Sequence, residues 1–139
     1  MLSLVSRYLH PKSINTTPLF IQYMTPIIIS LGGSIICPGE VDYFFLKQFK
    51  ALVLEYIQKD YRFIIMCGGG KVNSKYNTSA QRVSEISKTD LDWIGIMATR
   101  LNAELVRSIF GSIAYPKVII NPTKKVVTEK KVIVAAGWK

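Results

Sequence analysis

The sequence is poor in the residues that most often carry acid–base or metal chemistry. Its single histidine, His10, lies in an irregular amino-terminal stretch, which excludes a histidine-based nucleophilic or acid–base site. The two cysteines, Cys37 and Cys67, lie in or beside apolar segments, without a second cysteine or a histidine at ligand-like spacing. We therefore expect reduced, buried thiols of a cytoplasmic protein and no metal-ligating residues.

Acidic residues are also scarce, with nine Asp and Glu against 18 Lys and Arg, a net charge of +9. The basic residues are spread along the chain, and their longest runs are the pairs Lys124–Lys125 and Lys130–Lys131. Without a platform of basic and aromatic residues we expect no polynucleotide partner, and anionic small-molecule substrates account for the charge. No apolar run approaches the ~18 residues of a membrane helix. We therefore expect no membrane partner.

Length and composition limit the chain to one domain, because 139 residues that are 49% hydrophobic can bury a single core. Residues 1–24 are basic, rich in Ser and Thr and without an acid, a composition that resembles an organellar transit peptide. Alternatively, Met24 precedes the first predicted strand, and the residues before it are a non-native leader. In both cases we expect residues 1–24 to be disordered or non-native and the folded domain to occupy residues 25–139.

Two short apolar runs end abruptly in glycines. Phe63–Lys71 reads FIIMCGGGK, and Ile27–Ser34 reads IIISLGGS. Each predicts a buried parallel strand that ends in a loop whose backbone N–H groups a ligand can approach. The alternative for a lone glycine cluster is a tight strand-to-helix turn. Two such loops side by side would suit phosphoryl transfer, in which donor and acceptor phosphates must meet in line.

The second loop is not a Walker P-loop, since Val72 stands where Ser or Thr would hold magnesium. Beyond the two glycine-ended strands, periodicity predicts helices over 41–59, 71–87 and 90–110, the last capped by Thr89. Further strands are expected at 115–120 and 131–135. The second helix opens directly from Gly68–Gly70, so its amino terminus and the Lys71 ammonium group would add positive charge at the loop.

The apolar faces of the first and third helices are expected to pack on the sheet. These faces are Phe44, Phe45, Phe49, Leu52, Val53, Tyr56 and Ile57 in the first, and Leu91, Ile94, Ala98, Leu101, Leu105 and Ile109 in the third. A second stripe of the third helix carries Asp92, Gly95, Thr99 and Asn102. This stripe predicts close approach to another backbone or to a ligand. The alternative is an ordinary packing groove with Asp92 as a first-turn charge.

With these motifs the chain resembles the amino-terminal portion of the amino acid kinase family, and within it the archaeal-type uridylate (UMP) kinases. The resemblance covers residues 25–139. It is carried by SLGGS at 30–34, GGGK at 68–71, DWIGI at 92–96 continuing into TRLNA at 99–103, and AGWK at 136–139. It implies a three-layer α/β/α sandwich with a mainly parallel central sheet, here truncated, because the chain stops where another glycine loop begins.

The resemblance also implies roles for single residues. Catalytic positions would be Ser30, where many members carry a lysine, and Lys71. The phosphates of ATP would bind Gly32, Gly33, Ser34 and Gly69. The UMP acceptor would bind Gly68, Asp92, Gly137, Trp138 and Lys139, with Asp92 accepting hydrogen bonds from the ribose hydroxyls.

The implied reaction is ATP plus UMP giving ADP plus UDP with magnesium, catalysed by an enzyme of which this chain lacks the carboxyl-terminal, ATP-binding half. We expect the chain alone to be inactive and to form a homo-oligomer or bind a complementary half. One alternative is a kinase of the same family with another phosphate or carboxylate acceptor. Others are a catalytically inactive nucleotide-binding or assembly module, and an oligomer without a ligand.

Overall fold

The computed structural model describes residues 25–138, so the predictions for residues 1–24 and for Lys139 lie outside the described residues. Three parallel strands form one sheet in the order β1 (Ile27–Leu31), β2 (Phe63–Cys67) and β3 (Val132–Ala135). Ile65 of β2 stands opposite Ile29 on one side and Val134 on the other. The predicted α/β class with a parallel sheet is confirmed.

The helices are α1 (Gly33–Ile36), α2 (Tyr43–Gln58), α3 (Gly70–Val83) and α4 (Lys88–Phe110), followed by a 3₁₀ turn at Gly111–Ile113. The three long helices lie where periodicity predicts them. The predicted cap Thr89 is wrong, because Ser87 caps α4 by accepting a 3.1 Å hydrogen bond from the backbone N–H of Asp90. The helix therefore begins earlier than predicted, and Asp92 lies in its second turn rather than its first.

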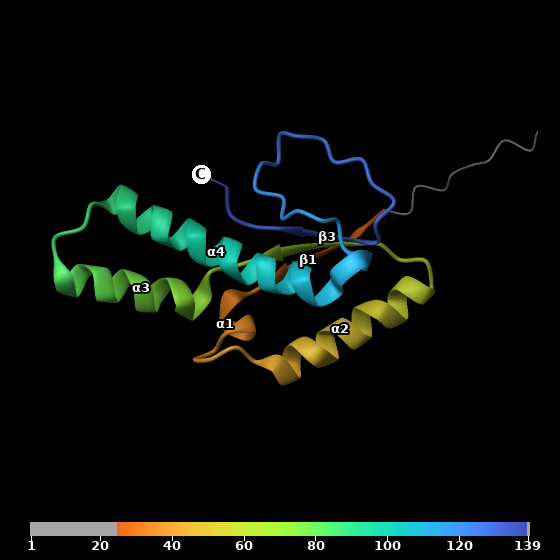
Figure 1. Ribbon diagram of the computed structural model, residues 1–139, viewed down its shortest axis with the longest axis horizontal. Coiled ribbons are helices and arrows are strands. Elements are labelled where there is room, and N and C mark those ends of the chain that lie inside the picture. Colours follow the sequence, from red (N-terminus) through yellow and green to blue (C-terminus); the bar gives the residue numbers. More distant parts are fainter. Residues whose placement is uncertain (1–24, 139) are drawn as a thin grey trace, which may run out of the picture.

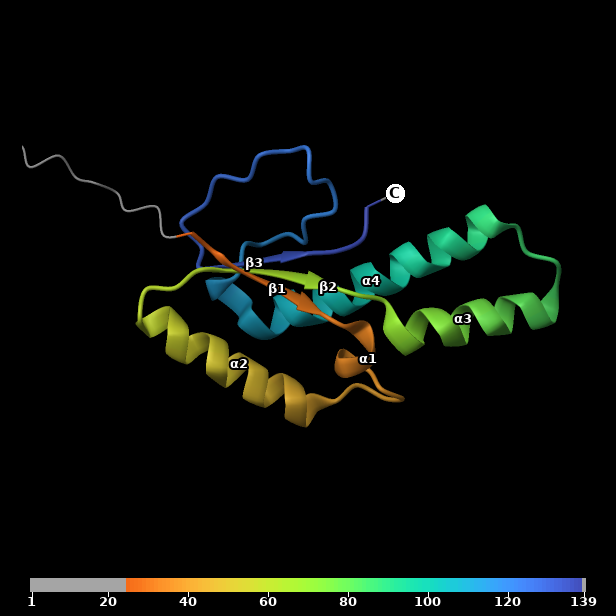
Figure 2. The same cartoon turned by 180° about the vertical axis from the view of Figure 1, so that it is seen from behind.

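Helices α1, α2 and α4 lie on one face of the sheet, and the loop that follows α4 lies on the other (Figures 1 and 2). The core forms between these helices and the sheet face that they cover. The strands contribute four buried residues to it, Phe63, Ile65, Val132 and Val134. The rings of Phe49 and Phe110 meet edge to face at 6.3 Å, which joins α2 to α4. The described residues thus supply the sheet and one helical layer of the sandwich.

The helices turn slightly different faces to the core than predicted. In α2, the expected core residues Phe44 and Leu52 are 65% and 53% exposed, and Leu46 is buried instead. In α4, Leu101 is 61% exposed. Its buried residues are Ala98, Asn102, Ala103, Val106 and Phe110. Ala98 is buried, and Leu105 and Ile109 pack against the core, as predicted. The difference is that Asn102 of the small and polar stripe is buried, whereas Leu101 is not.

The predicted strand at 115–120 is wrong. The segment meets β3 only through isolated bridges, Ala114 with Val132 and Ile119 with Ala135. Pro116 has no N–H to donate to a ladder, so the chain bends away between the two bridges. The outer edge of β3 is nevertheless covered, while β1 ends the sheet on the other side.

On the face away from the helices, Ile28 and Met66 are 66% and 49% exposed, and Ser30 is exposed between them on β1. No helix among residues 25–138 covers this open face of the sheet. Apolar side chains on a sheet face normally lie under a second layer.

Candidate functional site

The two glycine loops lie directly against each other at the carboxyl ends of β1 and β2. A Cβ built on Gly33 would lie 2.5 Å from the nitrogen of Gly70, and one on Gly70 would lie 2.8 Å from the Cα of Gly33. Gly70 also has a φ of +54°, a conformation that favours glycine. The prediction that the loops meet is confirmed, because neighbouring parallel strands end at the same edge of a sheet.

The glycines at this edge of the sheet have different roles. Gly33 is buried, and its missing side chain makes room for the other loop rather than for a ligand. Gly32 and Ser34 are exposed, and a Cβ on Gly32 would meet only the Ile35 side chain, at 3.7 Å. The part of the first loop that a ligand can reach is therefore Gly32 and Ser34.

Asn102 of α4 holds the second loop. Its side-chain amide donates to the carbonyl oxygen of Gly68 at 2.8 Å and to that of Gly69 at 3.3 Å. It is 4% exposed and is the buried polar residue of the described core. The buried carbonyls are thus satisfied by a side chain fixed in the helix. This confirms that the small and polar stripe of α4 approaches a backbone.

Thr99, one turn earlier on α4, holds the chain after β3. Its hydroxyl accepts from the N–H of Gly137 at 2.9 Å and donates to the carbonyl oxygen of Ile96 at 2.7 Å. A Cβ on Gly137 would lie 2.8 Å from the same hydroxyl. Helix α4 therefore fixes both the second glycine loop, through Asn102, and the glycine after β3, through Thr99.

A cavity of about 330 Å³ opens where the three strands end. Its lining includes four residues that the sequence marks as site candidates, Ser30, Gly68, Gly137 and Trp138, together with Thr99. Ile119 and Ile120 close one side with apolar surface. Cys67 also lines the cavity, and burial raises the pKa of its thiol to about 12. The thiol is therefore neutral at physiological pH.

Six of the described predicted residues do not line this cavity, namely Gly32, Gly33, Ser34, Gly69, Lys71 and Asp92. Lys71 is exposed on the first turn of α3. Asp92 is exposed on α4, one turn before Gly95, whose carbonyl oxygen would lie 3.4 Å from a Cβ on Gly69. Asp92 therefore lies near the second loop without contacting it. Lys75, one turn after Lys71 on α3, donates to the carbonyl oxygen of Gly39 at 2.8 Å.

Sequence reasoning missed Asn73. This residue of α3 lies between Gly69 and Gly95, with its side chain 3.2 Å from the Cβ position of each glycine. Its amide oxygen is buried and accepts no hydrogen bond in the described part of the chain. Its place four residues after Gly69, on the side of α3 that faces α4, is the signal that could have revealed it.

Residues 25–138 contain no group of three His, Cys, Asp or Glu side chains that could hold a metal ion. None of their helices is long and apolar enough to cross a membrane.

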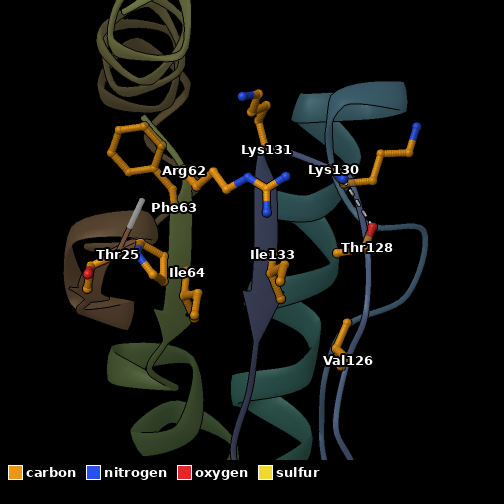
Figure 3. Close-up of a pocket in the computed structure, with 10 residues that line it drawn as sticks. Thr25, Arg62, Phe63, Ile64, Val126, Thr128, Lys130, Lys131 and Ile133 are labelled. Carbon is orange, nitrogen blue, oxygen red and sulfur yellow. Dashed lines mark hydrogen bonds between the residues drawn. The ribbon is translucent and has the colours of Figure 1, made fainter. Parts of the chain in front are cut away.

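The amino ends of the strands carry a different arrangement. Here a cavity of about 360 Å³ on the open face is lined by Arg62, Lys130 and Lys131 (Figure 3). Arg62 extends across β3 and pairs with Glu129 at 3.4 Å, and Lys131 pairs with Asp60. Lys130 donates to the carbonyl oxygen of Ser112 at 2.6 Å. These cations hold the loops at this end of the sheet.

Comparison with known proteins explains the glycine-bearing edge. The sequence model of the amino acid kinase family matches residues 25–136. The chain belongs to the amino acid kinase family.

Among its curated relatives is the uridylate kinase of Thermococcus kodakarensis, 35% identical over 113 residues, which are 80% of this chain and 49% of the relative. The uridylate kinase of Methanosarcina mazei is 37% identical over 113 residues, 80% of this chain and 47% of that one. The crystal structure of uridylate kinase from Archaeoglobus fulgidus superposes with a TM-score of 0.68 at 31% identity, covering 83% of this chain and 51% of that one. The chain thus spans about half the length of these relatives.

Proposed function

We propose that this chain is part of a UMP kinase-like phosphotransferase that converts ATP and UMP to ADP and UDP. The observation that carries the proposal is the contact between the two glycine loops, beside a cavity that the third strand end also lines. Such an edge brings two phosphate-sized loops together, as in-line transfer requires. The uridylate kinase relatives support the substrates.

In this proposal the donor phosphates lie over the reachable part of the first loop. Gly32 and Ser34 would hold the phosphates of ATP through backbone N–H groups, the buried Gly33 and Gly69 would shape the two loops beneath them, and Lys71 would add a cation at the start of α3. Ser30 lines the cavity and would contribute a hydroxyl rather than an ammonium group to the transferring phosphate. Magnesium would enter with ATP, since this ion is usually held largely by substrate phosphates and water.

The phosphate of the acceptor would lie in the cavity, and its ribose would lie outside it, beside α4. Gly68, Gly137, Trp138 and Lys139 would surround the UMP phosphate, and Asp92 would accept hydrogen bonds from its ribose hydroxyls. An oxygen of that phosphate attacks the γ-phosphorus of ATP, the bond from this phosphorus to the bridging oxygen breaks, and ADP leaves. The chain contributes placement and donors for the charge that develops.

Because the chain spans about half the length of its relatives, we propose that activity needs a complementary half. The exposed Ile28 and Met66 on the open face support this, since a partner would bury them. Lacking such a partner, the chain should self-associate and transfer no phosphate. Size-exclusion chromatography of the chain, alone and mixed with the remaining half of the Thermococcus kodakarensis enzyme, tests assembly.

Phosphate transfer by the mixed halves, followed as UDP formed from ATP and UMP, tests the reaction. We expect UDP only from the mixture. UDP formed by a monomeric chain on its own would contradict the need for a partner. A mixture that assembles and binds both nucleotides but makes no UDP would instead favour the second candidate function, a nucleotide-binding or assembly module. Transfer to another phosphate or carboxylate acceptor in preference to UMP would favour a sibling kinase.

Asp92 gives the sharpest test of the acceptor site. Asp92→Asn should weaken UMP binding to the assembled halves by on the order of 1–3 kcal/mol, because the ribose hydroxyls lose a charged partner. ATP binding and stability should stay nearly unchanged, because Asp92 is exposed on the helix surface. Calorimetric titration with each nucleotide measures both. Glu85→Gln, an exposed carboxylate between α3 and α4, is the matched control. Equal weakening of both nucleotides would remove Asp92 from the acceptor site.

A further inference from the structure

Asn73 carries a buried amide that hydrogen bonding does not hold in place. Its Oδ1 atom is buried and accepts no hydrogen bond from the described residues. A buried acceptor without a donor lowers stability, and an apolar side chain of the same shape would avoid that cost. Natural proteins most often break such local rules at functional sites. The position of this amide therefore calls for a role other than stabilising the fold.

The amide fills the space between two glycines. A Cβ on Gly69 would lie 3.2 Å from the Cβ of Asn73. A Cβ on Gly95 would lie 3.2 Å from the Oδ1 of Asn73 and 3.3 Å from its Nδ2. Gly69 belongs to the second glycine loop, and Gly95 belongs to α4, which lies beside α3 (Figures 1 and 2). The Asn73 side chain therefore sets how closely the loop and the first turn of α3 approach α4.

This separation joins the two ends of the proposed acceptor site. Gly68 lines the cavity that would hold the acceptor phosphate, and the second loop continues from it into α3. Asp92, which would accept hydrogen bonds from the ribose hydroxyls, lies one turn before Gly95 on α4. The phosphate and the ribose of a nucleotide are joined by a linkage of limited length. Both can bind well only if the loop and α4 stand at the matching separation.

We propose that Asn73 is a positioning residue that sets the separation between the second glycine loop and the turn of α4 carrying Asp92, and thereby the fit of UMP. The inference rests on the proposed function, because it concerns the acceptor of that reaction. Asn73 acts through its shape, since its buried oxygen has no donor among the described residues. The phosphates of ATP would lie over the first loop, so ATP binding should depend little on this separation.

Two substitutions separate shape from polarity. Asn73→Leu keeps the number of side-chain heavy atoms and removes the unpaired oxygen, whereas Asn73→Ala removes the spacer beyond Cβ. In the halves assembled as above, we expect Asn73→Ala to raise the dissociation constant of UMP about tenfold, and Asn73→Leu to leave it within about threefold. The dissociation constant of ATP should stay within about threefold in both variants. Calorimetric titration with each nucleotide measures these constants.

Stability should change independently of UMP affinity. Urea denaturation of the full 139-residue chain should show a higher midpoint for Asn73→Leu than for the wild type, because the buried unpaired oxygen is gone. Asn77→Leu is the matched control. The Oδ1 of Asn77 is also buried without a donor in the described part of the chain, one turn farther from the loop on α3. This control should raise the midpoint in the same way, and Asn77→Ala should leave UMP affinity within about threefold.

A double-mutant cycle tests the contact itself without any nucleotide. Gly95→Ala would press a methyl group against the Asn73 amide and should lower the urea midpoint of the chain. The same change should lower the midpoint much less in the Asn73→Ala background, where the space is free. Equal shifts in the two backgrounds would show that the amide does not separate α3 from α4, and would overturn the proposal.

The nucleotide titrations can overturn the proposal in other ways. UMP affinity that is unchanged in Asn73→Ala, or equal weakening of UMP and ATP, would exclude a positioning role toward the acceptor. Equal losses in Asn73→Leu and Asn73→Ala would assign the role to hydrogen bonding by the amide instead of its shape. If the assembled wild-type halves bind no UMP, the proposed function fails and this inference fails with it. That outcome is distinct, because it appears in the wild type before any substitution.

Discussion

The two ends of the sheet are held together by different interactions. At the carboxyl ends, backbone lies on backbone, with Gly33 against Gly68–Gly70 and Asn102 bonded to the second loop. At the amino ends, flexible charged side chains bridge the loops, as Arg62 does to Glu129 and Lys131 to Asp60. The first arrangement fixes positions closely, whereas the second can adjust by rotating side chains.

The two ends of the sheet therefore meet different requirements. The carboxyl ends must fix the positions of backbone groups, whereas the amino ends need only attach the loops to the sheet. A loop that must present backbone groups to phosphates needs fixed positions, since small displacements of reacting groups cost much of the rate. Exposed ion pairs contribute little and can be lost without moving the backbone. We therefore expect substitutions at the carboxyl end to affect stability and function together and substitutions at the amino end to affect neither strongly.

The largest expected effect is that of Gly33→Ala. A methyl group there would overlap the backbone of Gly70, which cannot rotate aside as a side chain would. We expect a loss of about 3 kcal/mol in the free energy of unfolding, at the upper end of overpacking. Urea denaturation measures it. The control Gly39→Ala adds the same methyl group with nothing within 4 Å and should change stability little. Equal effects would mean that the loops are not in tight contact.

Asn102→Ala comes next. The variant removes the donor to Gly68 and Gly69 and leaves buried carbonyls without a partner, which should cost about 2 kcal/mol of unfolding free energy. Asn121→Ala is the matched control, because Asn121 bonds only within its own exposed turn in the described structure. Thermal denaturation of both variants measures the difference in stability. If the Asn102 variant were as stable as the control, the hydrogen bonds of Asn102 would not stabilise the second loop.

The sequence predicted the carboxyl end better than it predicted the packing of α4. Glycines after apolar runs mark strand ends by local chemistry, and parallel order then places the loops together. The predicted face was right for Ala98 and wrong for Leu101, because hydrophobicity favours a leucine, whereas holding a glycine loop requires the polar Asn102 to be buried. That requirement arises only once the loops are in place, so no local pattern reveals it.

Two smaller errors have local causes. Ser87 and Thr89 are both good capping residues two positions apart, and the hydrogen bond of Ser87 to Asp90 decides between them. The segment after α4 has the composition of a strand, but Pro116 interrupts its pairing with β3. The groove between α4 and the segment 115–126 is lined from α4, that segment and Trp138 after β3, which sequence spacing alone does not bring together.

The pH dependence of stability tests whether the Cys67 thiol, at the carboxyl end of β2, is buried. Burial raises the pKa of its thiol from an ordinary 9.0 to about 12. Between these values the unfolded state loses its proton while the folded state keeps it, so the thiol's contribution to stability falls as pH rises. At pH 10 the loss relative to pH 8 should be about 1 kcal/mol. Urea denaturation at both pH values measures it, and Cys67→Ala should remove this part of the slope. A thiol that reacts rapidly with an aromatic disulfide at pH 8 would contradict the burial.

The smallest effect is expected at the amino end, from Lys131→Ala. The Lys131 ammonium holds the pKa of the Asp60 carboxyl below its ordinary 3.8 by hydrogen bonding and by its charge. A depressed carboxyl pKa stabilises the fold above the ordinary value, and that contribution is lost as pH falls below it. The pair is exposed, so the variant should melt close to the wild type at pH 7, and the small difference should vanish at pH 2 and in 1 M salt. A melting temperature that drops as far as in Gly33→Ala would show that the amino end is held as rigidly as the carboxyl end.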